Sequence, residues 1–414
     1  MVVIINMVWK IYLIYGMENL LNFEEFITES IREKTLKLSP EDKNKLIQLD
    51  RKFNKVLDEY TKEHIHFANV KNIDEQVEKI IYSVNTGIDF KIELEYEESK
   101  FSDTKWIDNL KIKIGELVDE FTTLDCYLTK FYIYKLKETL QSIMFLSEYV
   151  LTRKSPEIIT HPSKELYDIA KQYIKDNPYV DVHKLEEENP DFKRNKDPEY
   201  SRKRLQKIID DLGYGWKVII DDNMIPRMSV TSYKEFRISK RNKFSEIDLQ
   251  SLEVHEIKVH TARKYYALQT GLYLFLYGLK GHNQYDEGIA IYNSLNKLKI
   301  PKPNILFYIS IKILILFNIG KMNNLEIFKL VKKITKAPDD VIALAMVRAA
   351  RVFSYQPDFT SSTDTDYLEG YERVKNMSEN EREELIHYTI GPDQLFELDK
   401  IKEFLKVNKF KPLK

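Results

Sequence analysis

The sequence contains one cysteine in 414 residues, Cys126. A single thiol excludes an internal disulfide framework and is typical of a protein from a reducing compartment, so we expect a cytoplasmic protein. It also excludes a zinc site built from cysteines. Any metal site in this chain must therefore consist of histidines and carboxylates.

The sequence also lacks a surplus of either positive or negative charge. Lys and Arg (64 residues) nearly balance Asp and Glu (65 residues), which gives a formal net charge of −1. Without a strong field of either sign, the composition indicates neither nucleic acid nor an anionic membrane as a partner.

A hydrophobic run long enough to span a membrane is absent too. The first sixteen residues are apolar, but they include Asn6 and Lys10 and are too short to cross a bilayer. We expect residues 1–16 to be an N-terminal extension, with a docking segment or a signal-like anchor as the alternatives. The apolar stretch 304–320 carries Lys312 and is predicted to be a buried core helix. We therefore expect no stable insertion into a membrane.

Helical periodicity dominates the first half of the chain. Apolar residues recur at helical spacing over 17–65, and 106–151 is predicted to be one long amphipathic helical region, broken by nothing stronger than Gly115. Alternating apolar residues at 91–98 predict a short strand. We treat 17–185 as an N-terminal helical region.

The second half of the chain has a different pattern. Segments 216–220 and 235–239 are rich in residues that favour strands, and a polar turn region joins them. Ser245 and Asp248 form an S-x-x-D pattern that predicts the start of a helix. We therefore expect an α+β, mostly α-helical fold in which residues 186–414 form a second region.

The helix that begins near Ser245 carries His255-Glu256 and then His260. Zinc peptidases place two histidines four residues apart, about 40° around an α-helix, so that both reach one ion. Here the interval is five residues, which on a regular helix separates the side chains by about 140°. One inserted residue, a π-bulge, restores the shared face. We therefore predict a π-bulge, or an equivalent widened turn, within 256–260.

A third metal ligand is expected downstream, in Glu287. A glycine-rich return after the first helix predicts that a second helix folds back beside it and brings this carboxylate to the metal. Two histidines and one glutamate leave a fourth position for water, which is the arrangement of a catalytic rather than a structural zinc. The sequence thus predicts one zinc ion (Zn2+) held by His255, His260 and Glu287. The glycines of the return are Gly271, Gly278, Gly281 and Gly288.

Three segments, HEIKVH, GLKGHNQYDEGIA and RVFSYQPDFTSSTDTDYLEG, resemble the microtubule-associated tyrosine carboxypeptidase-like metallopeptidases and their bacterial relatives, also called tyrosine/phenylalanine carboxypeptidase-domain proteins. The family pattern is HEIGxH, then GLxGxxxxQEGLA, then an Arg-containing segment that leads to FTKDxxYLxG. The resemblance runs from about residue 68 to the C-terminus. It implies a mostly helical, zincin-like fold with a small sheet beside the zinc helix, and it makes 186–414 the catalytic region.

The resemblance also assigns individual residues. His255 and His260 match the paired ligands, Glu287 matches the glutamate ligand, and Glu256 matches the catalytic glutamate. Tyr367 matches the tyrosine of YLxG.

Several positions depart from the family pattern. Lys258 stands where the family has Gly, and Asp286 stands where it has Gln. Of the Arg-x-x-Arg-Gly pattern only Arg351 remains, because Ser354 and Tyr355 occupy the other positions. These changes lie outside the expected metal ligands.

The activity implied is that of a zinc carboxypeptidase that removes a C-terminal residue, Tyr or Phe, from a peptide or protein. Glu256 would act as the base toward the zinc-bound water. Tyr367 is the candidate donor to the developing oxyanion. A guanidinium suits the terminal carboxylate of the substrate, and Arg351 is the first choice, with Arg348 and Arg263 as further candidates.

Two alternatives remain at this point: a zinc endopeptidase or small-peptide amidase, and a non-catalytic, zinc-stabilised binding module. The segment 235–239 is either the sheet edge along which a peptide is added or an ordinary strand. His282 is expected to be a solvent-facing loop residue.

Overall fold

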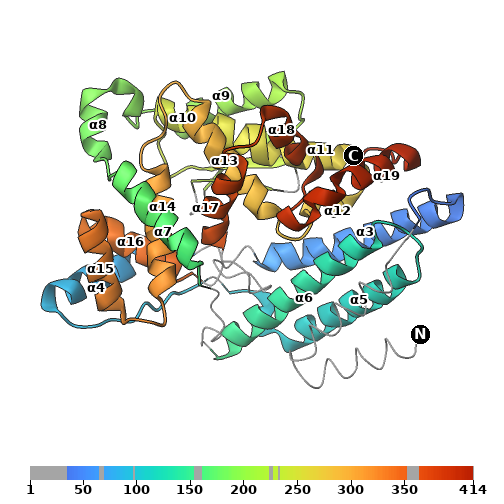
Figure 1. Cartoon of the computed structure of the whole chain (residues 1–414), viewed down its shortest axis with the longest axis horizontal. Coiled ribbons are helices and arrows are strands. Elements are labelled where there is room, and N and C mark those ends of the chain that lie inside the picture. The colour runs from blue at the N-terminus through green and yellow to red at the C-terminus, as the bar shows by residue number, and fades with distance from the viewer. Residues whose placement is uncertain are drawn as a thin grey trace.

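The computed structural model describes residues 35–64, 70–96, 98–152, 161–222, 227–231, 234–351 and 363–413. Helices account for most of these residues, with one small sheet (Figure 1). The α-helices are α3 (Pro40–His64), α4 (Ile73–Thr86), α5 (Thr104–Thr122), α6 (Thr129–Thr152), α7 (Lys164–Asp176), α8 (Val182–Glu188), α9 (Pro198–Asp211), α10 (Glu246–Leu252), α11 (Ala262–Gln269), α12 (Tyr273–Tyr277), α13 (His282–Asn296), α14 (Ile305–Asn318), α15 (Asn324–Thr335), α16 (Asp339–Ala349), α17 (Thr363–Val374), α18 (Glu379–Tyr388) and α19 (Leu398–Asn408). A π-helix, η5 (Glu253–Thr261), joins α10 to α11, and short 3-10 helices are η3 (Lys100–Ser102), η4 (Pro190–Phe192) and η7 (Pro392–Glu397).

The predicted fold class is confirmed, since the described chain is mostly helical and has one three-stranded sheet. The extension 1–16 lies outside the described residues. The division at residue 185 stays a prediction. Figure 1 shows α3, α5 and α6 side by side, with α4, α15 and α16 gathered at another end of the molecule.

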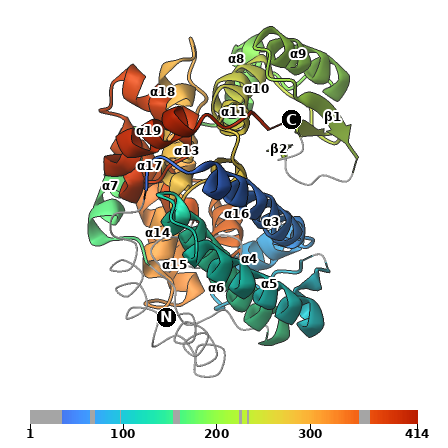
Figure 2. The ribbon, with the colours of Figure 1, turned by 90° about the vertical axis from the view of Figure 1, so that its right-hand side faces the viewer.

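The sheet is mixed, with strand order β1-β3-β2. β1 (Lys217–Asp221) pairs in parallel with β3 (Glu235–Ser239), and β2 (Met228–Val230) pairs with β3 antiparallel. The suggestion that 235–239 is an open edge is therefore wrong, because β3 is the central strand and is paired on both sides. β2 is too short to show an alternating pattern in the sequence. Figure 2 shows β1 and β2 beside α9.

The predicted strand at 91–98 is wrong for residues 91–96. In the described chain these residues form no strand, and only Tyr96 makes an isolated bridge, to Val70. Side chains at the start of α4 take the place of a partner strand. The amide of Glu93 donates to the side chain of Gln76 (3.1 Å), and the amide of Glu95 donates to Asn72 (3.0 Å). Backbone groups that pair with side chains need no neighbouring strand.

The long helix predicted over 106–151 is two helices, α5 and α6, and Gly115 lies inside the first of them. The chain turns between them because Thr122 and Thr123 bond their hydroxyls back to carbonyls in the last turn of α5, a local alternative to further helix. Leu124 and Cys126 are then buried in the turn, so the two helices pack against each other as a hairpin.

The apolar stretch at 304–320 is confirmed as a buried helix, α14, most of whose side chains are inaccessible. Of the helices that the structure describes, none has the combined length and apolar composition needed to cross a membrane.

Three hydrophobic clusters make up the interior of the part of the chain that the structure describes. The first joins α3, α5 and α6 to the C-terminal helices, the second surrounds α14, and the third lies between α9 and the sheet. The helix with the histidines contributes Val259 to the first cluster and Ile257 to the third. The neighbouring α13 contributes Ala290 to the first and Ile291 to the second. The candidate site therefore lies where the three clusters meet.

Candidate metal centre

The helix that carries both histidines is widened between them, as their five-residue interval requires. Ser245 caps its start, and with Asp248 it forms a capping box that confirms the predicted N-terminus. The π-helix η5 spans Glu253–Thr261, so the predicted π-bulge within 256–260 is confirmed. The imidazole rings of His255 and His260 consequently lie on one face, with their centroids 5.2 Å apart.

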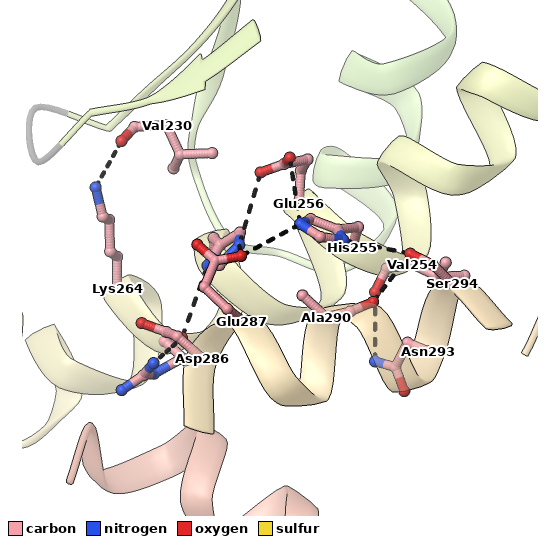
Figure 3. A network of polar contacts seen from close by, with 12 residues as sticks. Val230, Val254, His255, Glu256, Lys264, Asp286, Glu287, Ala290, Asn293 and Ser294 are labelled. Carbon is pink, nitrogen blue, oxygen red and sulfur yellow. Dashed lines mark hydrogen bonds and ion pairs between the residues drawn. The ribbon is translucent and has the colours of Figure 1, made fainter. Parts of the chain in front are cut away.

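Glu287 of α13 points at both imidazoles (Figure 3). Its Oε2 lies 3.8 Å from Nε2 of His255 and 3.7 Å from Nε2 of His260. Three ligands of a tetrahedral zinc at 2.0–2.1 Å are about 3.4 Å apart, so the observed spacing is close to that of a zinc site. Among the described residues, this buried Oε2 has no hydrogen-bond partner. A buried acceptor without a donor is costly, and a cation would satisfy it.

Glu256 lies equally near. Its carboxylate oxygens are 3.7 Å from Nε2 of His255 and 4.0 Å from Nε2 of His260, and the three side chains form a group that could hold a metal. Distance alone does not separate a ligand from a base here. The buried, unsatisfied Oε2 favours Glu287 as the ligand and Glu256 as the base, and both roles stay predictions.

The second ring nitrogen of His255 fixes its tautomer. Nδ1 lies 3.3 Å from the hydroxyl oxygen of Ser294, and that hydroxyl donates its own hydrogen to the carbonyl of Ala290 (2.9 Å). Nδ1 must therefore be the donor, and Nε2 keeps its lone pair toward Glu287. A metal ligand needs that neutral, unprotonated nitrogen.

Burial controls the charge of the site. It lowers the pKa of His255 well below the ordinary value, and neighbouring His260 adds to this effect. Burial likewise raises the pKa of Glu256 and of Glu287. Neutral imidazoles favour metal binding, and a carboxyl group with a raised pKa is better suited to accept and return a proton.

Two glycines bring Tyr367 to the site. A Cβ on Gly288 would lie 2.3 Å from the backbone of Gly370, and one on Gly370 would lie 1.8 Å from the carbonyl oxygen of Gln284. Helices α13 and α17 therefore touch backbone to backbone. The Glu287 carboxylate is the main cause of a Tyr367 pKa well above its ordinary value, so the Tyr367 hydroxyl lies within electrostatic range of that carboxylate.

Lys312, which sequence reasoning noted only as a charge in an apolar run, supports this tyrosine. Its ammonium forms an ion pair with the buried Asp364 and lies 5.1 Å from the centroid of the Tyr367 ring.

Lys264 was not predicted from the sequence. It donates to the carbonyl of Val230 in β2 (2.6 Å) and so attaches the edge strand to the metal-site helix. Neither lysine stands in a recognisable motif.

The three candidate arginines occupy different places. Arg351 and Arg348 lie at the end of α16, where Nε of Arg351 donates to the carbonyl of Arg348 (3.1 Å). The positive charge of Arg351 acts on Tyr367, so these two side chains lie within electrostatic range of each other. Arg263 is 3% exposed and forms an ion pair with Asp286. That pairing favours a structural role for Arg263, and substrate binding by all three stays a prediction.

His282 is not the solvent-facing loop residue that was expected. It is the first residue of α13, its ring packs over Gly278, and Nδ1 lies 2.9 Å from the carbonyl of Leu279. Gly278 and Gly281 have φ of +75° and +72°, and these left-handed turns direct the ring inward.

Comparison with known proteins gives one family. A family model described as microtubule-associated tyrosine carboxypeptidase matches residues 136–389, which is more than half of the chain. The match covers η5, α13 and α17, the three helices that carry the candidate site. No curated protein matches the chain.

Proposed function

Since this chain belongs to the microtubule-associated tyrosine carboxypeptidase family, we propose that it is a zinc-dependent carboxypeptidase that removes a C-terminal tyrosine or phenylalanine from a peptide or protein. The family's name supports the reaction and the removal of tyrosine, and removal of phenylalanine follows from the sequence resemblance. The reducing environment indicated by a single cysteine supports a cytoplasmic location.

One observation carries the proposal. A single unsatisfied oxygen of Glu287 lies 3.8 Å and 3.7 Å from the Nε2 atoms of two histidines that a π-helix brings to one face. Two neutral nitrogens and one carboxylate are the protein ligands of many catalytic zinc sites. When bound, zinc would acidify a water molecule and polarise the scissile carbonyl.

Glu256 has the position required of a general base and acid. In the proposed reaction its carboxylate takes a proton from the attacking water while the oxygen adds to the carbonyl carbon of the substrate. The same group then delivers the proton to the leaving amine nitrogen as the C–N bond breaks. The free amino acid and the shortened peptide are the products.

Tyr367 and Arg351 complete the proposed site. The Tyr367 hydroxyl lies within electrostatic range of Glu287 and keeps its proton because its pKa is raised, so it can donate to an oxyanion that develops beside it. Arg351, with Arg348 next to it, is the candidate for the terminal carboxylate of the substrate.

The experiment is a metal assay on the purified protein followed by a trimming screen. Peptides that end in Tyr, Phe or other residues are offered, each with a free and with an amidated C-terminus. We expect one zinc per chain, release of Tyr or Phe from the free acids, and no release from the amides. Glu287→Ala should lose both zinc and activity.

The other outcomes are decisive as well. Cleavage inside the peptides, or of the amides, would instead favour the endopeptidase or amidase alternative. A zinc-loaded protein that releases no residue type would contradict the carboxypeptidase and favour a binding module.

A further inference from the structure

We infer that Asp286 is a positioning residue, which holds the proposed ligand His260 in the tautomer and orientation that metal binding requires. The inference rests on the proposed function, because it assigns a role toward the same metal. In the sequence, Asp286 stood out because it replaces the Gln of the family pattern, and the geometry now gives it a role.

The two ring nitrogens of His260 face different acids. Nε2 lies 3.7 Å from Oε2 of Glu287 and 4.0 Å from Glu256, whereas Nδ1 lies 3.7 Å from Oδ1 of Asp286. A neutral imidazole carries one N–H. If Nε2 gives its lone pair to a metal, the hydrogen is on Nδ1 and needs an acceptor. Asp286 is within about 1 Å of hydrogen-bond distance from that nitrogen.

Asp286 and Glu287 are adjacent on α13, and they approach the two ring nitrogens of His260 from different sides. Residues i and i+1 on a helix point about 100° apart. Glu287 and Asp286 therefore reach His260 from two directions, one toward the metal side of the ring and the other toward its far side. Figure 3 shows both carboxylates projecting from α13 toward the metal-site helix.

Asp286 is itself held in place. Its side chain is 14% exposed and forms an ion pair with Arg263, which lies three residues after His260 and thus about one helical turn along the same helix. On its other side, Nε2 of His282 lies 4.0 Å from Oδ2. The buried guanidinium holds the Asp286 carboxylate in place beside Nδ1 of His260. Arg263 would therefore act on the metal through Asp286.

His255 provides an internal comparison. Its Nδ1 faces the neutral hydroxyl of Ser294 at 3.3 Å, whereas the Nδ1 of His260 faces a carboxylate. A charged acceptor orients an imidazole more strongly and makes its other nitrogen a better ligand. Loss of the Asp286 charge should therefore cost more metal affinity than loss of the Ser294 hydroxyl.

The test measures zinc affinity by competition with a chromophoric chelator, together with the visible absorption spectrum of the cobalt-loaded protein. Asp286→Asn keeps the shape of the side chain and removes its charge. We expect its zinc dissociation constant to rise 10- to 100-fold and its cobalt spectrum to shift. Ser294→Ala should show a smaller rise.

A matched control is Glu397→Gln. Glu397 is 13% exposed and forms a partly buried ion pair with Lys130, as Asp286 (14%) does with Arg263, but it lies on η7. Its loss should lower thermal stability without changing zinc affinity or the cobalt spectrum. Should Asp286→Asn not fold, Asp286→Gln replaces it in the same assay.

The outcomes separate this inference from the proposed function. If wild type binds zinc and the Asp286 variant binds it within twofold of wild type, Asp286 is not a positioning residue and the proposed function stands. If Glu397→Gln weakens zinc binding as much as Asp286→Asn does, the effect is general destabilisation and the inference is overturned. If wild type binds no zinc, both fail.

Discussion

Glu256 and Glu287 lie within 4 Å of the same two imidazole nitrogens, yet different consequences are expected from their loss. Changing Glu256 to Gln removes the proton acceptor and leaves the other three side chains in place. We expect zinc content to be retained and kcat to fall by a factor of about 10³ or more, since general acid–base catalysis alone contributes about 10²–10⁴. Metal analysis and peptide kinetics on the same preparation check this.

Glu253→Gln is the control for that variant. Glu253 lies on the same π-helix, but its carboxylate pairs with the exposed Lys258 at 2.7 Å. Its loss should leave kcat unchanged. Normal turnover by Glu256→Gln would exclude Glu256 as the base.

Tyr367→Phe removes a hydroxyl and little else. If the hydroxyl stabilises the oxyanion, kcat should fall by about 10²-fold, with KM and zinc content nearly unchanged. Tyr371→Phe, one turn later on α17 beside Tyr173, should behave as wild type. Equal activities of the two variants would show that Tyr367 is only a packing residue.

At the scale of residues, the sequence was most informative where the spacing is local. The five-residue interval between His255 and His260 requires a widened helix, and that prediction is confirmed. Glu287 could be proposed because the glycine-rich return limits where the second helix lies. The contacts of Lys264, Lys312 and Asp286 depend on which helices become neighbours, and no local pattern reports that.

At the scale of elements, the contact between α13 and α17 depends on glycine. Gly370→Ala would place a methyl group 1.8 Å from the carbonyl oxygen of Gln284, so the helices must separate. We expect the free energy of unfolding to fall by about 1–3 kcal/mol, the usual cost of overpacking, and activity to fall because Tyr367 moves away from Glu287. Urea denaturation and peptide kinetics measure the two effects.

Gly115→Ala is the matched control in α5. A Cβ at that position meets nothing within 4 Å, in the chain as described. Alanine should therefore raise the free energy of unfolding by about 0.5–1 kcal/mol, because glycine loses more backbone entropy in a helix. If Gly370→Ala were equally stabilising, the close helix contact would be refuted.

The errors about elements have a common physical cause. Residues 91–96 alternate like a strand, but the side chains at the start of α4 satisfy their backbone groups. The sequence left 235–239 as either a sheet edge or an ordinary strand, and the three-residue β2, which has no visible pattern in the sequence, pairs with β3 and makes it central. The break after Thr122 follows from local hydroxyl bonds and from burial of the turn. Which partner a segment finds is decided by the whole fold.

At the scale of the molecule, Asp50 connects α3 to α12. Its carboxylate accepts hydrogen bonds from the amides of Tyr273 (2.9 Å) and Leu274 (3.2 Å) and from the hydroxyl of Tyr132 (2.7 Å). Burial raises its pKa from 3.8 to about 6. The native state therefore holds this proton more tightly than the unfolded state does, and stability is lost as the pH rises from about 4 to about 6.

We predict that the free energy of unfolding of wild type falls across this pH range by on the order of 3 kcal/mol relative to Asp50→Asn, which has no such proton. Denaturation of both proteins at pH 4, 5, 6 and 7, in the presence of a chelator, measures the difference. Most of the change should fall between pH 4 and 6, with only a small further change between pH 6 and 7 as the titration is completed. A difference that changes mainly above pH 6, or none below pH 6, would contradict the assignment.

The three hydrophobic clusters meet at η5 and α13, and this arrangement affects how well the protein resists proteolysis. A metal bound between these two helices would connect segments that each pack into two of the clusters. With free zinc at 100 times its Kd, binding would add about 2.7 kcal/mol to the free energy of unfolding. Depletion of zinc should then loosen all three interiors together. A protease should digest such metal-starved chains completely instead of leaving resistant fragments, so the supply of zinc would govern how much enzyme persists as well as how much is active.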